Sequence, residues 1–187
     1  MNDSLSKFFR NEQSGIPVWF LRQAGRHIPD YFEIRKKSDS FVNFCLNTKL
    51  IIESTKLPLK YYDLNAAIIF SDILMIPWAM NREINFIKGV GPNLKPMVPN
   101  ETKILKNINI SQKLEPLRKS ISILRKELPQ STSLIGFAGA PWTLACYMIE
   151  GHSSKDFINT RKSLWDSNKW FMELIDTLSI YVAEKLE

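Results

Sequence analysis

The sequence predicts an α/β protein built on parallel strands, and three observations support this prediction. Short apolar runs of strand length alternate with longer segments in which apolar residues recur at helical spacing. The runs are nearly continuous in apolar residues, as in strands that are covered on both faces of a sheet. The helical segments are long enough to cross from one parallel strand to the next. A doubly wound sheet and a βα barrel both satisfy this pattern.

Three apolar runs are the expected strands. Residues 17–21 (PVWFL) follow a Ser-Gly break, residues 66–70 (AAIIF) are continuously apolar, and residues 133–138 (SLIGFA) precede a turn of small residues. Between the first two runs, residues 31–62 have the pattern of several helices, with one break near Ser38-Asp39-Ser40 and another near Pro58. Each expected strand is thus followed by polar or helical sequence.

The remaining segments predict one irregular region and three helices. Residues 82–98 contain two glycines and two prolines, which predicts a loop or hairpin. Apolar residues then recur three and four apart, at Leu114, Leu117, Ile121, Leu124 and Leu128, which predicts one helix packed on a core rather than a coiled coil. A proline at position 141 suits the first turn of the next helix, and residues 171–182 predict the last one.

The length of the chain bears on which architecture it forms. The chain has 187 residues, whereas a complete βα barrel typically needs about 250. Its last residues are helix-like and carry no Gly, Asn or Pro stop signal. We therefore expect an incomplete barrel, a single domain over residues 1–187 that lacks its C-terminal part. A small complete α/β domain is the alternative.

Composition and charge exclude several classes of partner. The net charge of +6 comes from scattered residues, and Lys36-Lys37 is the longest basic run, so we expect no nucleic-acid partner. Cys45 and Cys146 lie in separate apolar stretches without a metal-ligand pattern, which indicates buried free thiols. The N-terminus lacks the apolar region of a secretory signal, and no run approaches the ~18 residues of a membrane span. We expect a cytoplasmic protein without a membrane partner.

Polar residues follow each expected strand, where the active sites of parallel barrels are built. After the first strand, Arg22 and Arg26 offer planar forks that match carboxylates, with a solvated arginine pair as the alternative. After the second strand, Ser71-Asp72 places a carboxylate among apolar residues. This carboxylate is either functional or the cap of a short helix beginning at Ile73.

The third polar group lies in residues 136–143 (GFAGAPWT), with Tyr147 further on. A strand, a small-residue turn and a helix N-terminus let an anionic ligand approach the backbone. For Tyr147, a core tyrosine with a satisfied hydroxyl is the alternative. His27 and His152 have no partner pattern and are expected in surface loops; dinucleotide, zinc-protease and nucleophile motifs are absent. The residues alone predict a basic, partly apolar pocket for an anionic ligand.

The strings LRQAGRHIPDY, AAIIFSDIL, GFAGAPWTL and YMIEGHSSKDF, in this order and spacing, make the chain resemble the uroporphyrinogen decarboxylase family from about Ile16 onward. The resemblance implies the N-terminal portion of a (β/α)8 TIM barrel, with about three of its strands. It also implies a cytoplasmic enzyme of haem and tetrapyrrole synthesis that is a homodimer when full length. Its reaction would convert the four acetate side chains of uroporphyrinogen III to methyls, giving coproporphyrinogen III, without metal or cofactor.

The resemblance also assigns roles to individual residues. Asp72 would face the macrocycle and accept hydrogen bonds from its pyrrole N–H groups, which stabilises a cationic ring. Arg22 would assist proton transfer. The residues implied to bind substrate are Arg22, Gln23, Ala24, Gly25, Arg26, Asp72, Phe137 and Tyr147. Phe137 would pack on the macrocycle, and Tyr147 would contact substrate near the reacting acetate.

Some features depart from the family pattern. His27 stands where a tyrosine is usual, Cys146 where a small or hydroxyl residue is usual, and His152 where a second glycine is common. Further substrate contacts of the family, a serine and a C-terminal histidine, lie outside this sequence. We therefore expect the 187-residue polypeptide alone to be inactive and poorly soluble. The alternatives are a corrinoid- or coenzyme M-dependent methyltransferase of the same superfamily, an inactive fragment, or a basic binding domain.

Overall fold

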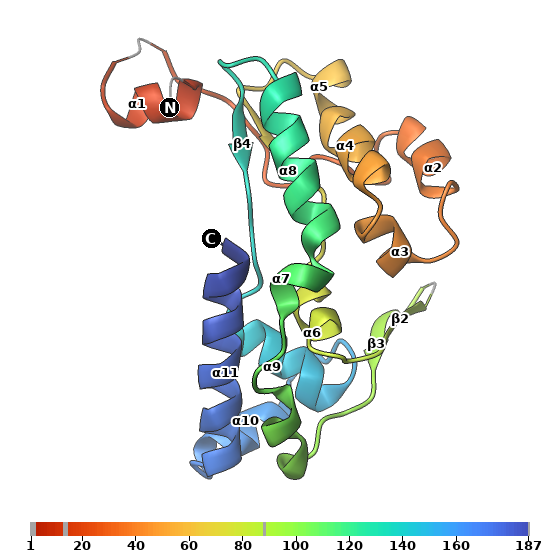
Figure 1. Cartoon of the computed structure of the whole chain (residues 1–187), viewed down its shortest axis with the longest axis vertical. Helices are drawn as coiled ribbons and strands as arrows, with labels where there is room; N and C mark the ends of the chain where they lie inside the picture. The colour runs from red at the N-terminus through yellow and green to blue at the C-terminus, as the bar shows by residue number, and fades with distance from the viewer. Residues whose placement is uncertain (1–2, 13–14, 88, 187) are drawn as a thin grey trace. The chain divides into compact units, whose positions relative to one another are not determined.

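The computed structural model describes residues 3–12, 15–87 and 89–186 (Figure 1). Its helices and strands are, in order, α1 (Ser4–Phe9), α2 (Asp30–Arg35), α3 (Phe41–Cys45), α4 (Thr48–Lys56), α5 (Pro58–Tyr61), β1 (Ala66–Ile68), α6 (Met75–Ala79), β2 (Ile84–Ile87), β3 (Gly91–Leu94), the 3-10 helix η1 (Pro99–Leu105), α7 (Ile110–Lys113), α8 (Glu115–Glu127), β4 (Ser133–Ile135), α9 (Pro141–Glu150), α10 (Ile158–Trp165) and α11 (Lys169–Leu186). The fold is α/β, as the sequence predicts.

The chain divides into two compact units, and each combines two separate stretches of sequence. The first unit consists of Met1–Ser71 and Glu115–Phe137, and the second of Asp72–Leu114 and Ala138–Glu187. The prediction that residues 1–187 form a single domain stays a prediction.

The first unit is built around a parallel pair of strands. β1 and β4 pair in parallel, with Ala66 opposite Ser133 and Ile68 opposite Ile135. Helix α4 packs against both β1 and α8, because each of these elements contributes an apolar face. The buried cluster between them consists of Ile51, Ala67, Ile69, Leu117, Leu124 and Leu128. The predicted helix with a core-facing stripe is therefore confirmed as α8, although Ile121 is 39% exposed.

A second cluster of the first unit surrounds the chain just after β1. It consists of Ile28, Tyr31, Ile34, Phe44, Leu50 and Leu57, and Phe70 packs against both clusters. The rings of Phe44 and Phe70 meet edge to face with centroids 5.0 Å apart, a favourable geometry for two aromatic rings. This contact anchors the side chain of Phe70, the residue directly before Ser71-Asp72.

The prediction that residues 17–21 form a strand is wrong. The segment is extended but makes no strand ladder; Val18 N–H donates to Asn65 Oδ1 at 2.7 Å, and Val18 C=O accepts from Asn65 N–H at 2.9 Å. Ile16, just before the segment, is 82% exposed, and Leu21, its last residue, is 84% exposed. An apolar run becomes a strand only where partner backbones supply a ladder, so the described residues contain two parallel strands rather than the expected three.

The second unit is mainly helical. Its strands β2 and β3 form an antiparallel hairpin, which confirms the loop or hairpin predicted there. Helix α11 packs against α9, α7, α6 and η1, and its buried face includes Phe171, Leu174 and Leu178. The hydroxyl of Tyr181 donates to Leu105 C=O and accepts from Ile108 N–H, both at 2.8 Å. These bonds tie the last helix to the segment between η1 and α7.

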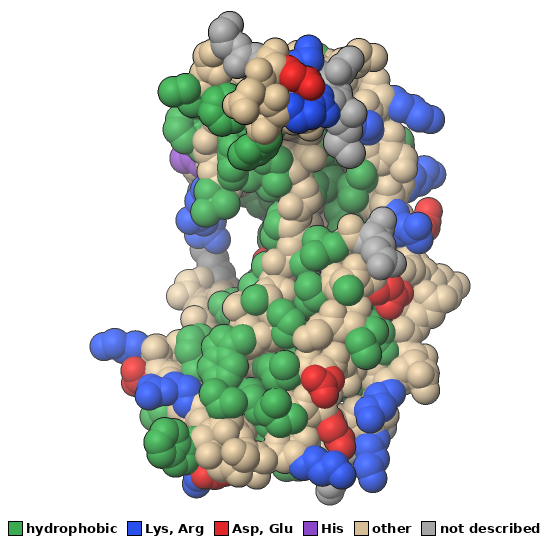
Figure 2. All heavy atoms as spheres, turned by 90° about the vertical axis from the view of Figure 1, so that its left-hand side faces the viewer, with side chains coloured by type: hydrophobic (Ala, Val, Ile, Leu, Met, Phe, Trp, Pro, Cys, Tyr) green, Lys and Arg blue, Asp and Glu red, His purple; other side chains and the backbone are tan. Residues whose placement is uncertain are grey.

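Apolar side chains also remain on the outer surface of α10 and α11. They include Ile158, Leu164, Trp165, Met172 and Ile180, which we call the α10–α11 face. Figure 2 shows hydrophobic side chains gathered over this part of the molecule. Within the described residues, no helix is long and apolar enough to cross a membrane. Both cysteines are buried, and neither forms a disulfide within the described residues, as predicted.

Candidate functional site

The arginine-containing segment is attached to β1 through Gln23. The side-chain amide of Gln23 donates to Ala66 C=O at 2.8 Å and accepts from Ile68 N–H at 3.0 Å. These two hydrogen bonds give partners to the backbone groups of Ala66 and Ile68 on the edge of β1 that does not pair with β4. Gln23 is only 6% exposed, whereas Arg22 and Arg26 on either side of it are exposed. The buried glutamine holds the loop in place, and the two guanidinium groups stay available to a ligand.

Beyond β1, the backbone is held by a helix rather than by a strand. Phe70 N–H donates to the hydroxyl of Thr55 on α4 at 2.9 Å, and that hydroxyl donates to Ile51 C=O at 2.7 Å. Thr55 is completely buried. The chain then enters Ser71-Asp72. Sequence reasoning missed Thr55, because a threonine within an amphipathic helix gives no local signal of its partner.

Asp72 is half-buried at the start of the second unit. Its Oδ1 accepts from Leu74 N–H at 2.8 Å, and its C=O accepts from Met75 N–H at 3.2 Å. This is a local turn and not a helix cap, because α6 begins at Met75, its N-cap residue is Leu74, and no side chain among the described residues caps it. The prediction that Ser71 or Asp72 caps a helix beginning at Ile73 is therefore wrong. Burial raises the pKa of Asp72, and the Leu74 hydrogen bond and the charge of Lys185 oppose that rise without cancelling it.

Gly139 brings the loop after Asp72 against the turn before α9. A Cβ atom at this glycine would lie 2.7 Å from Leu144 Cδ2 and 3.0 Å from Ile73 Cβ. These distances are shorter than normal Cβ contacts, so any side chain at position 139 would require Leu144 or Ile73 to shift. Within the second unit, the structure therefore brings Ile73, the residue after Asp72, against Gly139 in the turn before α9.

The remaining predicted residues are distributed over both units. Phe137 is partly buried against the core cluster of α4 and α8 in the first unit. Tyr147 is half-buried on α9 in the second unit, beside the buried Leu144 turn. Arg22, Gln23, Ala24, Gly25 and Arg26 belong to the first unit, and Asp72 belongs to the second. The gathering of these residues around one ligand stays a prediction.

A buried carboxylate of the second unit was also missed. Glu150, at the end of α9, is 8% exposed and accepts hydrogen bonds from Thr160 N–H at 3.0 Å and from the Asn159 amide at 2.8 Å. Burial raises the pKa of Glu150, but the hydrogen bonds from Thr160 and Asn159 outweigh it and hold the pKa below its usual value. Glu150 joins α9 to the first turn of α10, which makes it structural.

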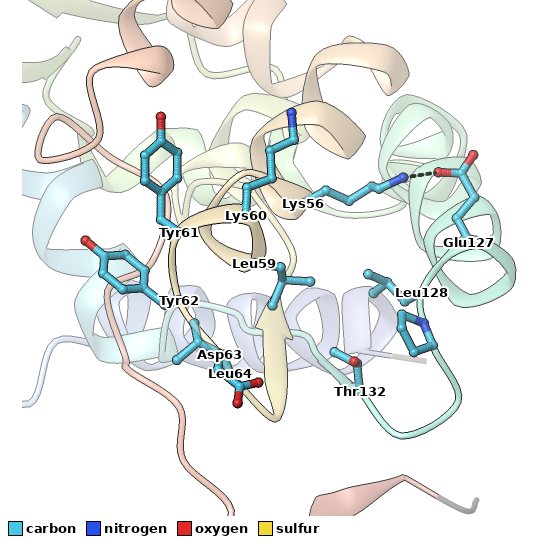
Figure 3. A pocket seen from close by; sticks show the side chains of 11 residues that line it. Lys56, Leu59, Lys60, Tyr61, Tyr62, Asp63, Leu64, Glu127, Leu128 and Thr132 are labelled. Atoms are coloured by element: carbon cyan, nitrogen blue, oxygen red, sulfur yellow. Dashed lines mark hydrogen bonds and ion pairs between the residues drawn. The ribbon is translucent and has the colours of Figure 1, made fainter.

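A pocket of about 570 Å³ lies in the first unit, ahead of β1 and β4 in the chain (Figure 3). Residues 59–64 line one side of it and residues 127–129 line the other, and an ion pair joins Lys56 to Glu127 at 3.0 Å. None of the predicted site residues lines this pocket. Its lining residues precede β1 and β4 in the chain, whereas Asp72 follows β1 and belongs to the second unit.

The two histidines take no part in a cluster of ligands. His27 is exposed and its ring stacks on Tyr62 with centroids 6.5 Å apart. His152 is exposed in the loop after α9. The prediction that both lie at the surface is confirmed. Among residues 3–12, 15–87 and 89–186, no group of three His, Cys, Asp or Glu side chains could hold a metal ion.

Sequence comparison finds proteins that are similar to this chain over most of its length. The chain is 44% identical over 170 residues to the uroporphyrinogen decarboxylase of Chelativorans sp. (strain BNC1), covering 91% of this chain and 50% of that protein. It is 39% identical over 186 residues to the uroporphyrinogen decarboxylase of Rickettsia felis, covering 100% of this chain and 54% of that protein. The chain spans about half the length of the curated relatives it matches.

A solved structure of similar fold is a methyltransferase from Methanosarcina mazei. It matches with a TM-score of 0.69 and 15% identity, over 95% of this chain and 52% of that one. This identity shows a shared fold alone and gives no support to the methyltransferase alternative. The family model for uroporphyrinogen decarboxylase (URO-D), by contrast, matches residues 1–187. The chain belongs to the uroporphyrinogen decarboxylase family.

Proposed function

We propose that this protein is a uroporphyrinogen decarboxylase, a carboxy-lyase that converts the four acetate side chains of uroporphyrinogen III to methyls and yields coproporphyrinogen III. Family membership over the whole chain supports this activity. The observation that carries the proposal is the placement of Asp72. Its carboxylate is held by a tight turn two residues after a core-anchored phenylalanine, and burial raises its pKa.

The chemistry explains why a fixed carboxylate is needed. When an acetate loses CO2, the electron pair of the broken C–C bond must move into an acceptor, and a protonated pyrrole ring is one. A carboxylate that accepts hydrogen bonds from the ring N–H groups stabilises this cation. CO2 leaves as this electron pair moves into the ring, and a proton then adds to the former CH2 carbon to make the methyl group. The proton that had been added to the ring is released, so that one proton is consumed for each CO2 formed. We assign the stabilising role to Asp72.

Partial burial favours this role. A carboxylate that is partly removed from water interacts more strongly with a nearby cation than an exposed one does. The turn to Leu74 also fixes the carboxylate before substrate arrives, so little reorganisation is required during the reaction. No metal or cofactor is required for the step as written.

Cations are assigned to the rim of the substrate. Arg22 and Arg26 are exposed beside the buried Gln23 anchor, and their forks suit the carboxylates of the macrocycle. Arg22 also assists proton transfer through its charge. Gln23 holds this segment, with Ala24 and Gly25 allowing close approach, while Phe137 packs on the ring and Tyr147 lies near the reacting acetate.

The architecture of the whole protein is part of the proposal. β1 and β4 pair in parallel, and α8 is the helix that directly precedes β4 in the chain. Parallel strands joined by helices are the repeating unit of a (β/α)8 barrel. We take β1, α8 and β4 as parts of such a barrel, of which this chain is the N-terminal portion. A homodimer in the cytoplasm is the expected assembly, as the family resemblance implies.

The test is Asp72→Asn in the full-length protein as encoded. Coproporphyrinogen formation from uroporphyrinogen III would be followed by the fluorescence of the oxidised products. We expect a loss of at least about 100-fold in kcat, as for removal of one preorganised electrostatic group, with an unchanged far-UV circular dichroism spectrum. The matched control is Asp63→Asn, because Asp63 is an exposed acid before β1. Turnover by Asp72→Asn equal to that of the control would end the proposal.

A further inference from the structure

We propose that Thr55 is a positioning residue for the decarboxylation, because its hydroxyl holds the backbone from which the chain enters Ser71-Asp72. The inference rests on the proposed function of Asp72. Thr55 lies on α4, touches no predicted substrate contact, and acts through Phe70. No motif in the sequence points to it.

The hydroxyl of Thr55 has both of its hydrogen-bonding functions in use. It donates its proton to Ile51 C=O at 2.7 Å, one turn earlier in α4, and accepts from Phe70 N–H at 2.9 Å. Because the proton is committed to the helix carbonyl, an oxygen lone pair is left for the Phe70 amide. Thr55 is completely buried, so water does not compete for either bond.

The hydrogen bond between Thr55 and Phe70 takes the place of the one that a neighbouring strand would supply at the edge of β1. On the edge facing β4, Ile69 N–H donates to Ile135 C=O at 2.9 Å. On the opposite edge, Ile68 N–H donates to the side chain of Gln23, and Phe70 N–H donates to the side chain of Thr55. Thr55 therefore supplies the last contact on this edge before Asp72, two residues further along the chain.

Helix α4 is a rigid source for this contact. Its first residue, Thr48, donates through its hydroxyl to Pro116 C=O at 3.1 Å, and Ile51 is fully buried in the cluster with α8. The ring of Phe70 is fixed separately by Phe44. The residue before Ser71-Asp72 is thus held both by its ring and by its amide, and the position of α4 determines where the chain leaves β1.

Catalytic geometry is sensitive to small displacements. A catalytic group must stay within about 0.5 Å of its productive position, and a shift of about 1 Å can reduce the rate by about 100-fold. Removing the Thr55 hydroxyl would leave the N–H of the partly buried Phe70 without its partner, so the chain would move to find another. Asp72 would move with it.

The experiment compares Thr55→Val, which keeps the side-chain shape without the hydroxyl, with Thr55→Ser, which keeps the hydroxyl. All variants are measured in the full-length protein as encoded. We expect Thr55→Val to lower kcat by about 10- to 100-fold with KM changed less than about twofold, and Thr55→Ser to restore most of the rate. Ser54→Ala is the control, because Ser54 is equally buried and its hydroxyl has no hydrogen-bond partner among the described residues.

Two results would overturn the inference. One is a Thr55→Val enzyme with a lower urea midpoint but the kcat of the wild type, which would make Thr55 structural only. The other is rapid hydrogen exchange of the Phe70 amide in the wild-type protein, a measurement that does not depend on the variant folding. If Asp72→Asn is inactive while Thr55→Val is fully active, only this inference fails; if Asp72→Asn is active, the proposed function fails first.

Discussion

Gln23→Met tests whether the amide of Gln23 attaches the arginine segment to β1. Methionine has a similar length and fills a similar volume, but it replaces the amide that contacts Ala66 C=O at 2.8 Å and Ile68 N–H at 3.0 Å. Gln23 is 6% exposed, so both backbone groups would be left buried without a partner. Each such group costs about 1–3 kcal/mol, which predicts a loss of about 2–6 kcal/mol in the free energy of unfolding.

The assay is urea unfolding of the full-length protein as encoded, followed by tryptophan fluorescence and circular dichroism. Gln112→Met is the matched control, because Gln112 is exposed on α7 and exposed substitutions usually change stability by less than about 0.5 kcal/mol. A shift for Gln23→Met no larger than that of the control would refute the reasoning, since it would mean that water or another group satisfies β1 equally well.

Gln23→Glu adds a pH dependence to the same test. A protonated carboxyl at position 23 can still donate to Ala66 C=O and accept from Ile68 N–H, whereas an ionised carboxylate has no proton to donate and faces a carbonyl oxygen. Its pKa is therefore expected to rise on folding. Between the unfolded-state and folded-state pKa values of this carboxyl, the folded state then binds more protons than the unfolded state. The variant should therefore lose stability as pH rises from the lower of these two pKa values to the higher. Stability of this variant that increases with pH across the interval would contradict the assignment.

The remaining predictions concern structural contacts and solubility. The pKa of Asp3 is lowered to about 2 by hydrogen bonds that outweigh its burial, so about 2 kcal/mol of stability should be present above pH 4 and be lost as pH falls towards 2; the difference from Asp3→Asn in urea unfolding should vanish there. Glu150→Ala should lower the free energy of unfolding by about 2–4 kcal/mol, because Thr160 N–H loses its buried acceptor; a loss below about 0.5 kcal/mol would contradict this. Gly139→Ala should destabilise by about 1–3 kcal/mol, whereas Gly136→Ala should not, because a Cβ there meets no atom within 4 Å. The 187-residue polypeptide expressed alone should be inactive and sediment with insoluble material, because the α10–α11 face is exposed; a soluble, active preparation would contradict this.

Much of the first unit could be predicted from local pattern. The runs at 66–70 and 133–138 became the parallel pair, and the stripe from Leu114 to Leu128 became α8. These patterns indicate burial, because apolar residues that recur at a fixed period share one face, and that face packs on a core; Ile121 is the exception in α8. The strings that identify the family are likewise properties of the sequence, and the family model confirms them over residues 1–187.

The error at 17–21 has a different origin. An apolar run reports that a segment avoids water, but a ladder requires a neighbouring backbone at the right register. That neighbour is not encoded within the run. In the described residues, Asn65 and Gln23 provide the contacts that a strand would otherwise make, so the segment is extended beside β1 without becoming a strand.

The sequence by itself determined the α/β class, the family, and the residue types suited to a ring bearing many carboxylates. Only the tertiary structure decided that Gln23 and Thr55 complete one edge of β1, that Gly139 admits Ile73, and that a buried glutamate joins α9 to α10. The physical reason is that each of these depends on a partner chosen by packing at long range, such as Ala66 for Gln23, 43 residues away. Local pattern records whether a side chain is buried, but not which group it meets there.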